Sequence, residues 1–355
     1  MQASVPSSTD IIGQHQRMKL RDGRYLLLGF IAIAPLAILW ALSSGAYHIG
    51  LWELISTQGD TAFELAILLD IRLPRVLMTV STGAGLAVCG LTLQALTRNP
   101  LADPGLLGVS ACAALFAGIS MLISSRLFAE FGAPMLFTPA MAFAGAAVAM
   151  LALIAISRRN RGSGNLLLIL AGVAVNAAAM TCLGLVTFIA DDQTLRQITF
   201  WSMGSYAGSS WPMVWLTSIT VVFCLVYLFK QRYALMQLSC GEQQARCQGV
   251  NVALLKRKTL LVCAAIIAVC VSFTGIVGFV GLVVPHICRL LLGGHLGRLM
   301  PVVAIVGGLL VTIADTLART LIVPAELPVG LLTSTLGVPF FIYLIWHQQS
   351  RGQHV

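Results

Sequence analysis

Two adjacent carboxylates, Asp191 and Asp192, are the residues whose type and spacing most directly suggest enzyme chemistry. Paired carboxylates can hold Mg²⁺ for the transfer of a diphosphate-bearing group, because Mg²⁺ prefers oxygen ligands. A membrane-embedded transferase of this kind needs a second acidic cluster on the same face. The other acidic residues are scattered along the chain, so a transferase is only a secondary hypothesis.

ATP hydrolysis is a second chemistry to consider. The segment 238–243, LSCGEQ, is similar to the signature loop of ABC ATPases. A nucleotide-binding domain also needs the phosphate loop GxxxxGK[ST], and the sequence contains no Gly-Lys dipeptide. The nine cysteines form no CxxC pair, which argues against a metal site. We therefore predict that the chain has no ATPase activity, binds no cofactor and holds no metal.

Asp315 and Arg319 are charged residues in an otherwise apolar stretch. They are four positions apart, so on a helix they share one face and can pair, either as a structural pair or as part of a docking site. His48 and His286 are conceivable haem ligands, although a structural hydrogen bond is the favoured interpretation. No chain of acidic or histidine residues follows the apolar segments, as ion-coupled carriers usually require.

The composition excludes most soluble classes of protein. Apolar residues make up 58% of the 355 residues and charged residues 10%, whereas a soluble domain has about 25% charged residues. This excludes a soluble enzyme, a nucleic-acid binder and a disordered chain, and it predicts an all-α polytopic membrane protein. About ten segments are predicted to span the membrane: 26–46, 73–96, 105–125, 135–157, 166–190, 212–229, 259–277, 279–292, 301–322 and 328–346.

The basic residues predict the orientation of these spans. With ten spans, seventeen of the 22 Lys and Arg residues fall on the side of the two termini and five on the other side. The positive-inside rule then places both termini in the cytoplasm. The net charge of +9 therefore reflects topology and indicates no nucleic-acid partner. We expect cytoplasmic tails at 1–25 and 347–355 around a single membrane domain at 26–346.

The predicted cytoplasmic loop 230–258 is the most informative segment outside the membrane. Residues 241–248 are predicted to form a short amphipathic helix that Gly249 ends, with another turn beginning at Asn251. The loop also contains small and apolar residues. A pair of short helices at the membrane face would suit contact with a partner protein.

Several segments together resemble the permease subunits of type II ABC importers, which take up iron-siderophores, haem and cobalamin. Two of them, NPLADPGLLG within 72–110 and GFVGLVVPH at 278–286, are highly specific in combination. The resemblance covers nearly the whole chain from about residue 26. Its other stretches are LAGVAVN at 170–176, GEQQARCQGV at 241–250 and the segment 314–345.

This resemblance implies a homodimer in the inner membrane of a bacterium. Two separate ATPase subunits, which bind ATP and Mg²⁺, would attach on the cytoplasmic side, and a periplasmic binding protein would deliver the substrate. The implied substrate is a bulky iron chelate, with haem favoured over a ferric siderophore and then cobalamin. An ion-coupled secondary transporter is the main alternative.

The resemblance also implies roles for individual residues. Arginines on the outer surface would dock the binding protein, and residues of the cytoplasmic loop would couple to the ATPase. A cytoplasmic gate would lie near the NPLA turn and the start of the fifth span. The docking residues are Arg72, Arg75 and Arg319; the coupling residues are Glu242, Ala245, Gly249 and Val250; the gate residues are Asn99, Leu101 and Asn165.

Overall fold

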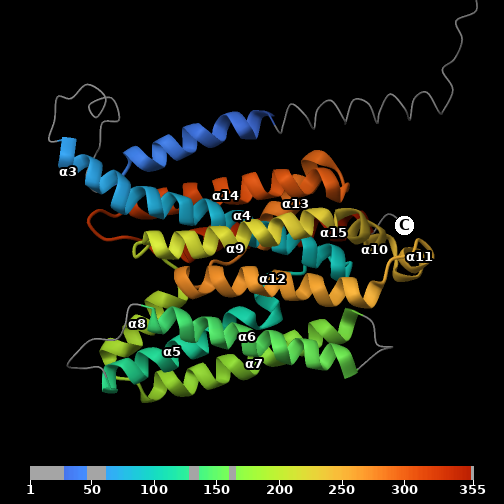
Figure 1. The fold of residues 1–355 in the computed structure, drawn as a ribbon, viewed down its shortest axis with the longest axis horizontal. Helices are drawn as coiled ribbons and strands as arrows, with labels where there is room; N and C mark the ends of the chain where they lie inside the picture. The colour runs from blue at the N-terminus through green and yellow to red at the C-terminus, as the bar shows by residue number, and fades with distance from the viewer. Residues whose placement is uncertain (1–27, 46–60, 128–135, 160–164, 353–355) are drawn as a thin grey trace, which may run out of the picture.

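The computed structural model describes residues 28–45, 61–127, 136–159 and 165–352, and this part of the chain is a bundle of helices (Figure 1). The predicted tail 1–25 and His48 lie outside it. The helices are Leu28–Ser43, α3 (Thr61–Ala66), η1 (Ile67–Arg72), α4 (Leu73–Thr97), η2 (Pro104–Leu107), α5 (Val109–Leu127), α6 (Phe137–Arg159), α7 (Asn165–Ile189), α8 (Asp192–Ser202), α9 (Trp211–Lys230), α10 (Arg232–Cys240), α11 (Glu242–Cys247), α12 (Val252–Thr274), α13 (Val280–Leu292), α14 (Leu296–Thr320) and α15 (Val329–Gly352).

The helices confirm an all-helical, multi-pass membrane protein. Among the described residues, six helices are long and apolar enough to cross a bilayer, and three shorter apolar helices accompany them. Each of the ten predicted apolar segments coincides with one helix of the bundle. The predicted and observed boundaries differ most at α12, which begins at Val252 and not at residue 259. The prediction began too late because the first turns of this helix carry basic residues, which hydropathy alone excludes from a span.

Helix α4 is the central helix of one half of the bundle. It packs against α9, α12, α13 and α14, and most of its residues are buried. Glycines allow two of these neighbours to approach its backbone. A Cβ atom at Gly90 would collide with the backbone of Gly281 on α13, and one at Gly83 would collide with Gly307 on α14. Small residues at such crossings are typical of membrane helices, where close packing replaces the hydrophobic effect.

Helix α12 connects this half of the bundle to the other half. It contacts α4 and α9 on one side and α5 and α6 on the other (Figure 1). Helix α7 packs against α5 and α6 and leaves much of its length exposed, including Leu185 and Phe188. The bundle has two ends, which we call the α3/α8 end and the α10/α11 end after the short helices found there (Figure 1).

The first prediction concerns the contact between α4 and α13. Gly90→Ala is expected to destabilise the protein by about 1–3 kcal/mol, because the added methyl group has no space against the backbone of Gly281. Gly29→Ala is the control, since a Cβ at Gly29 meets no atom within 4 Å. Thermal unfolding of both variants in detergent tests the contact. Equal unfolding temperatures for the two variants would contradict it.

Candidate functional sites at the two ends of the bundle

A network of buried charges lies at the α3/α8 end, and its centre is Arg75. Arg75 lies in the first turn of α4, opposite Asp315 on α14. The Arg75 Nε and Nη2 atoms each lie 2.9 Å from an oxygen of Asp315. The Nη1 and Nη2 atoms each lie 3.0 Å from an oxygen of Glu326, in the segment between α14 and α15. One guanidinium group therefore holds two carboxylates, each through two hydrogen bonds.

The other two arginines of the network cap a helix. The helix Leu28–Ser43 ends at this point, and the carbonyl groups of its last turn lack partners within the helix. Arg72 Nη1 donates to the carbonyl oxygens of Leu42 at 2.6 Å and Ser43 at 2.8 Å. Arg319 Nη2 donates to the carbonyl oxygen of Ala41. Positive groups at this position also complement the negative end of the helix dipole.

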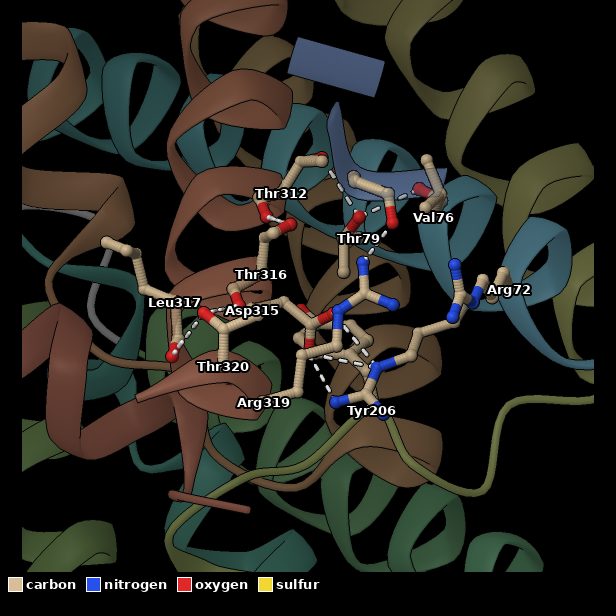
Figure 2. Close-up of polar contacts among 12 residues, drawn as sticks. Arg72, Val76, Thr79, Tyr206, Thr312, Asp315, Thr316, Leu317, Arg319 and Thr320 are labelled. Atoms are coloured by element: carbon tan, nitrogen blue, oxygen red, sulfur yellow. Dashed lines mark hydrogen bonds and ion pairs between the residues drawn. The ribbon is translucent and has the colours of Figure 1, made fainter. Parts of the chain in front are cut away.

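These contacts explain how three arginines and two carboxylates share one buried region. The excess positive charge faces the carbonyl end of a helix, which supplies partial negative charge. Arg319 is also 3.9 Å from Asp315, so the predicted pairing across one helical turn is present, although it is longer than the contact of Asp315 with Arg75. Figure 2 shows Arg72, Asp315 and Arg319 pointing toward one another.

The burial of the three arginines differs from the sequence expectation. Arg72, Arg75 and Arg319 were expected on the outer surface, but they are 4%, 6% and 5% exposed. The expectation of surface arginines is therefore wrong, because distant parts of the chain supply carbonyl and carboxylate groups that take these cations inside. Their role in docking remains a prediction. Glu326 was not predicted as a partner of Arg75, since no regular spacing relates the two residues.

Hydroxyl groups extend this network along the contact of α4 with α14. The Oγ1 atoms of Thr79 and Thr312 are 2.9 Å apart. Thr82 Oγ1 is 2.6 Å from the hydroxyl oxygen of Tyr206, which lies in the segment between α8 and α9. Figure 2 shows Thr79 and Thr312 on facing helices. The polar contacts fix how α4 and α14 are positioned relative to each other.

Glu242 connects two helices at the α10/α11 end. It is the first residue of α11, and its carboxylate forms an ion pair with Lys256 in the second turn of α12. The carboxylate also lies 3.6 Å from Arg246, whose side chain is largely exposed. Lys256, followed by the charges of Arg98 and Arg246, lowers the pKa of Glu242 below its ordinary value. Because the pKa is lowered, the ion pair persists at neutral pH and weakens only in acid.

Gly249 ends α11 through its own backbone conformation. Its φ angle is +83°, which glycine adopts with little cost. The amide of Gly249 donates to the carbonyl of Arg246 at 3.0 Å, and that of Val250 to the carbonyl of Ala245 at 3.0 Å. This pattern is a Schellman motif. Ala245 is fully buried, so it anchors α11 against the bundle.

The turn after α4 contains two of the predicted gate residues. Asn99 Oδ1 accepts a hydrogen bond from the amide of Leu101 at 3.0 Å. Asp103 Oδ1 accepts one from the amide of Gly105 at 2.6 Å and starts the short helix η2. Burial raises the pKa of Asp103, while the Gly105 amide opposes the shift. Asn165 is the first residue of α7, and its side chain lies outside the described part of the structure.

The residues considered for other chemistries have local structural roles. Asp191 is the N-cap of α8, where its carboxylate accepts hydrogen bonds from Thr194. His286 packs edge-on against Phe340 with ring centroids 5.7 Å apart. In the described part of the chain, no group of three or more His, Cys, Asp or Glu residues is arranged to hold a metal ion.

The fold and these two ends define a helical membrane transport protein. Residues 33–347 match the FecCD transport family, and the chain belongs to this family. It is the permease subunit of an ABC importer and is not itself an ATPase.

Relatives with different names share nearly the full length of the chain. The hemin transport system permease protein HmuU of Yersinia pestis is 42% identical over 92% of this chain and 97% of its own. The vitamin B12 import system permease protein BtuC of Serratia proteamaculans is 34% identical, covering 98% and 99% of the two chains. The iron(3+)-hydroxamate import system permease protein FhuG of Bacillus subtilis is 37% identical, covering 90% and 91%.

A solved structure agrees with the fold. It is described as an inward-facing conformation of a putative metal-chelate type ABC transporter. The TM-score is 0.81 at 27% sequence identity, and the match covers 91% of this chain and 99% of the other.

The second prediction tests the buried carboxylate of Asp315. Asp315→Asn is expected to destabilise the protein by about 3–5 kcal/mol, because Arg75 keeps its burial and loses a charged partner. Asp192→Asn, which changes an exposed carboxylate in the first turn of α8, should cost less than about 1 kcal/mol. Thermal unfolding in lipid nanodiscs measures both. A similar cost for the two variants would show that the buried pair contributes little.

Proposed function

We propose that this chain is the membrane permease of an ATP-driven importer that carries a bulky iron chelate or a corrinoid into the cytoplasm. Haem is the first candidate substrate, a ferric siderophore the second and cobalamin the third. The observation that places haem first is the 42% identity with a hemin transport permease, against 34–38% with the vitamin B12 permeases and 37% with the hydroxamate permease. No residue of the chain independently identifies haem.

The proposed assembly is a homodimer in the cytoplasmic membrane of a bacterium. The α10/α11 end faces the cytoplasm, which agrees with the excess of Lys and Arg assigned to that side. The exposed side of α7 is the proposed contact with the second copy, since it includes the small residues Ala177, Ala178 and Thr181. Small residues are enriched where membrane helices pack against each other.

The partners attach at opposite ends of the bundle. Two ATPase subunits, carrying ATP and Mg²⁺, bind at the α10/α11 end through the motif that includes Glu242, Ala245, Gly249 and Val250. The burial of Ala245 and the Schellman turn at Gly249 support a pre-formed surface there. The turn with Asn99 and Leu101 belongs to the cytoplasmic gate. A periplasmic binding protein docks at the α3/α8 end, where Arg72, Arg75 and Arg319 lie.

An ion-coupled transporter is the alternative function. Proton coupling requires a titratable group within the membrane that changes partners during transport. Asp315, a carboxylate within the membrane helices, is instead buried and held by Arg75. This argues for a permease whose energy comes from a partner protein.

The third prediction separates these two functions. Proteoliposomes that contain the permease, its ATPase subunits and its binding protein should take up haem only when ATP is supplied. Proteoliposomes with the permease alone, under a proton or sodium gradient, should take up none. Uptake driven by the ion gradient without ATPase subunits would refute the importer. ATP-driven uptake of a siderophore or cobalamin in place of haem would refute only the proposed substrate.

The fourth prediction concerns the ion pair between α11 and α12. Glu242→Gln should reduce substrate-stimulated ATP hydrolysis about threefold to fivefold, the factor equivalent to the loss of about 1 kcal/mol. The reason is that the neutral side chain no longer holds Lys256. Arg246→Gln is the matched control, because Arg246 is largely exposed and lies farther from the carboxylate. Equal hydrolysis by the two variants would argue against this coupling.

A further inference from the structure

Nearly all N–H donors of Arg75 already have partners within the permease itself. A guanidinium group has five N–H donors. One donor of Nε and one of Nη2 contact Asp315, while the second donor of Nη2 and one of Nη1 contact Glu326. One N–H of Nη1 remains. A further carboxylate therefore cannot bind Arg75 through two parallel hydrogen bonds, which is the arrangement that guanidinium groups favour.

The two carboxylates on Arg75 differ in their access to solvent. The side chain of Asp315 is 2% exposed and belongs to α14, whereas that of Glu326 is 41% exposed. Glu326 lies in the segment between α14 and α15, and its neighbours Ile322 and Val323 are exposed as well. Asp315 is enclosed between helices. Glu326 is therefore the partner that another molecule can replace.

The backbone next to Glu326 is held independently of its side chain. The amide of Leu327 donates to the carbonyl of Ala318 at 3.0 Å, and the amide of Val329 donates to the carbonyl of Gly204 at 3.0 Å. The side chain of Glu326 can consequently rotate away from Arg75 while the segment keeps its position. Such a movement requires only rotamer changes in a half-exposed side chain.

We propose that Glu326 occupies the place on Arg75 that a carboxylate of the periplasmic binding protein takes on docking. This inference rests on the docking function proposed above. The exchange replaces one carboxylate by another, so Arg75 is never buried without sufficient negative charge. Asp315 remains in contact throughout and keeps the guanidinium group oriented. The exchange also explains how an arginine that is almost fully buried can serve a partner protein.

The fifth prediction is that Glu326→Gln tightens the complex. The substitution keeps the size of the side chain and removes the charge that competes for Arg75. The dissociation constant of the purified binding protein encoded beside this permease should fall roughly fivefold, the factor that a half-exposed ion pair contributes. The measurement uses the complete permease–ATPase complex in nanodiscs on a biosensor surface. Asp192→Asn is the control, because it removes the same charge from an exposed position at the same end.

A double-mutant cycle assigns the effect to Arg75. In an Arg75→Gln background, Glu326→Gln should no longer change the affinity. The proposed competition is wrong if Glu326→Gln alone leaves the binding unchanged or weakens it. It is also wrong if Asp192→Asn gives the same gain in affinity. Both conclusions hold even where Arg75→Gln weakens docking. If Arg75→Gln and Arg319→Glu both fold and bind normally, the docking function fails as well. If the Arg75 variants do not fold, Glu326→Gln and its control still decide the proposal.

Discussion

The backbone contact of α4 with α13 and α14 is the constraint on which the rest of the structure depends. Lipid gives helices no hydrophobic reason to associate, so close packing and polar contacts must hold the bundle together. Gly83 and Gly90 allow two neighbours to reach the backbone of α4. This approach also places Arg75 within hydrogen-bonding distance of Asp315. The charge network is thus a consequence of helix packing as much as a cause of it.

The two ends of the bundle use charge differently. At the α3/α8 end, the arginines are buried and donate hydrogen bonds to carboxylates and to helix carbonyls. At the α10/α11 end, the ion pair of Glu242 with Lys256 is partly exposed and joins α11 to α12. Buried pairs are costly to separate, whereas partly exposed pairs exchange partners readily. The α3/α8 end therefore keeps a fixed arrangement of charges, except for the side chain of Glu326. The α10/α11 end has a partly exposed ion pair that can change partners.

The sequence predicted the helices well and the charge network poorly. Ten apolar segments matched helices because hydropathy follows directly from burial in lipid, whereas the start of α12 was missed where basic residues extend the helix. The pairing of Asp315 with Arg319 followed from helical spacing. The stronger partner, Arg75, is 240 residues away in the chain, so only the three-dimensional packing reveals it. Gly249 was correctly predicted to end the short helix, since left-handed backbone conformations favour glycine.

The junction between α11 and α12 has a mechanical consequence. Two amide hydrogen bonds close the turn at Gly249, the side chain of Asn251 immediately caps α12, and Glu242 ties the start of α11 to Lys256. The chain turn and the ion pair join α11 to α12 at both ends of α11, so α12 follows a displacement of α11 while both contacts persist. The 23 residues of α12 lead from this junction toward the opposite end of the bundle. A displacement of this short helix at one end would therefore reach both ends of the molecule.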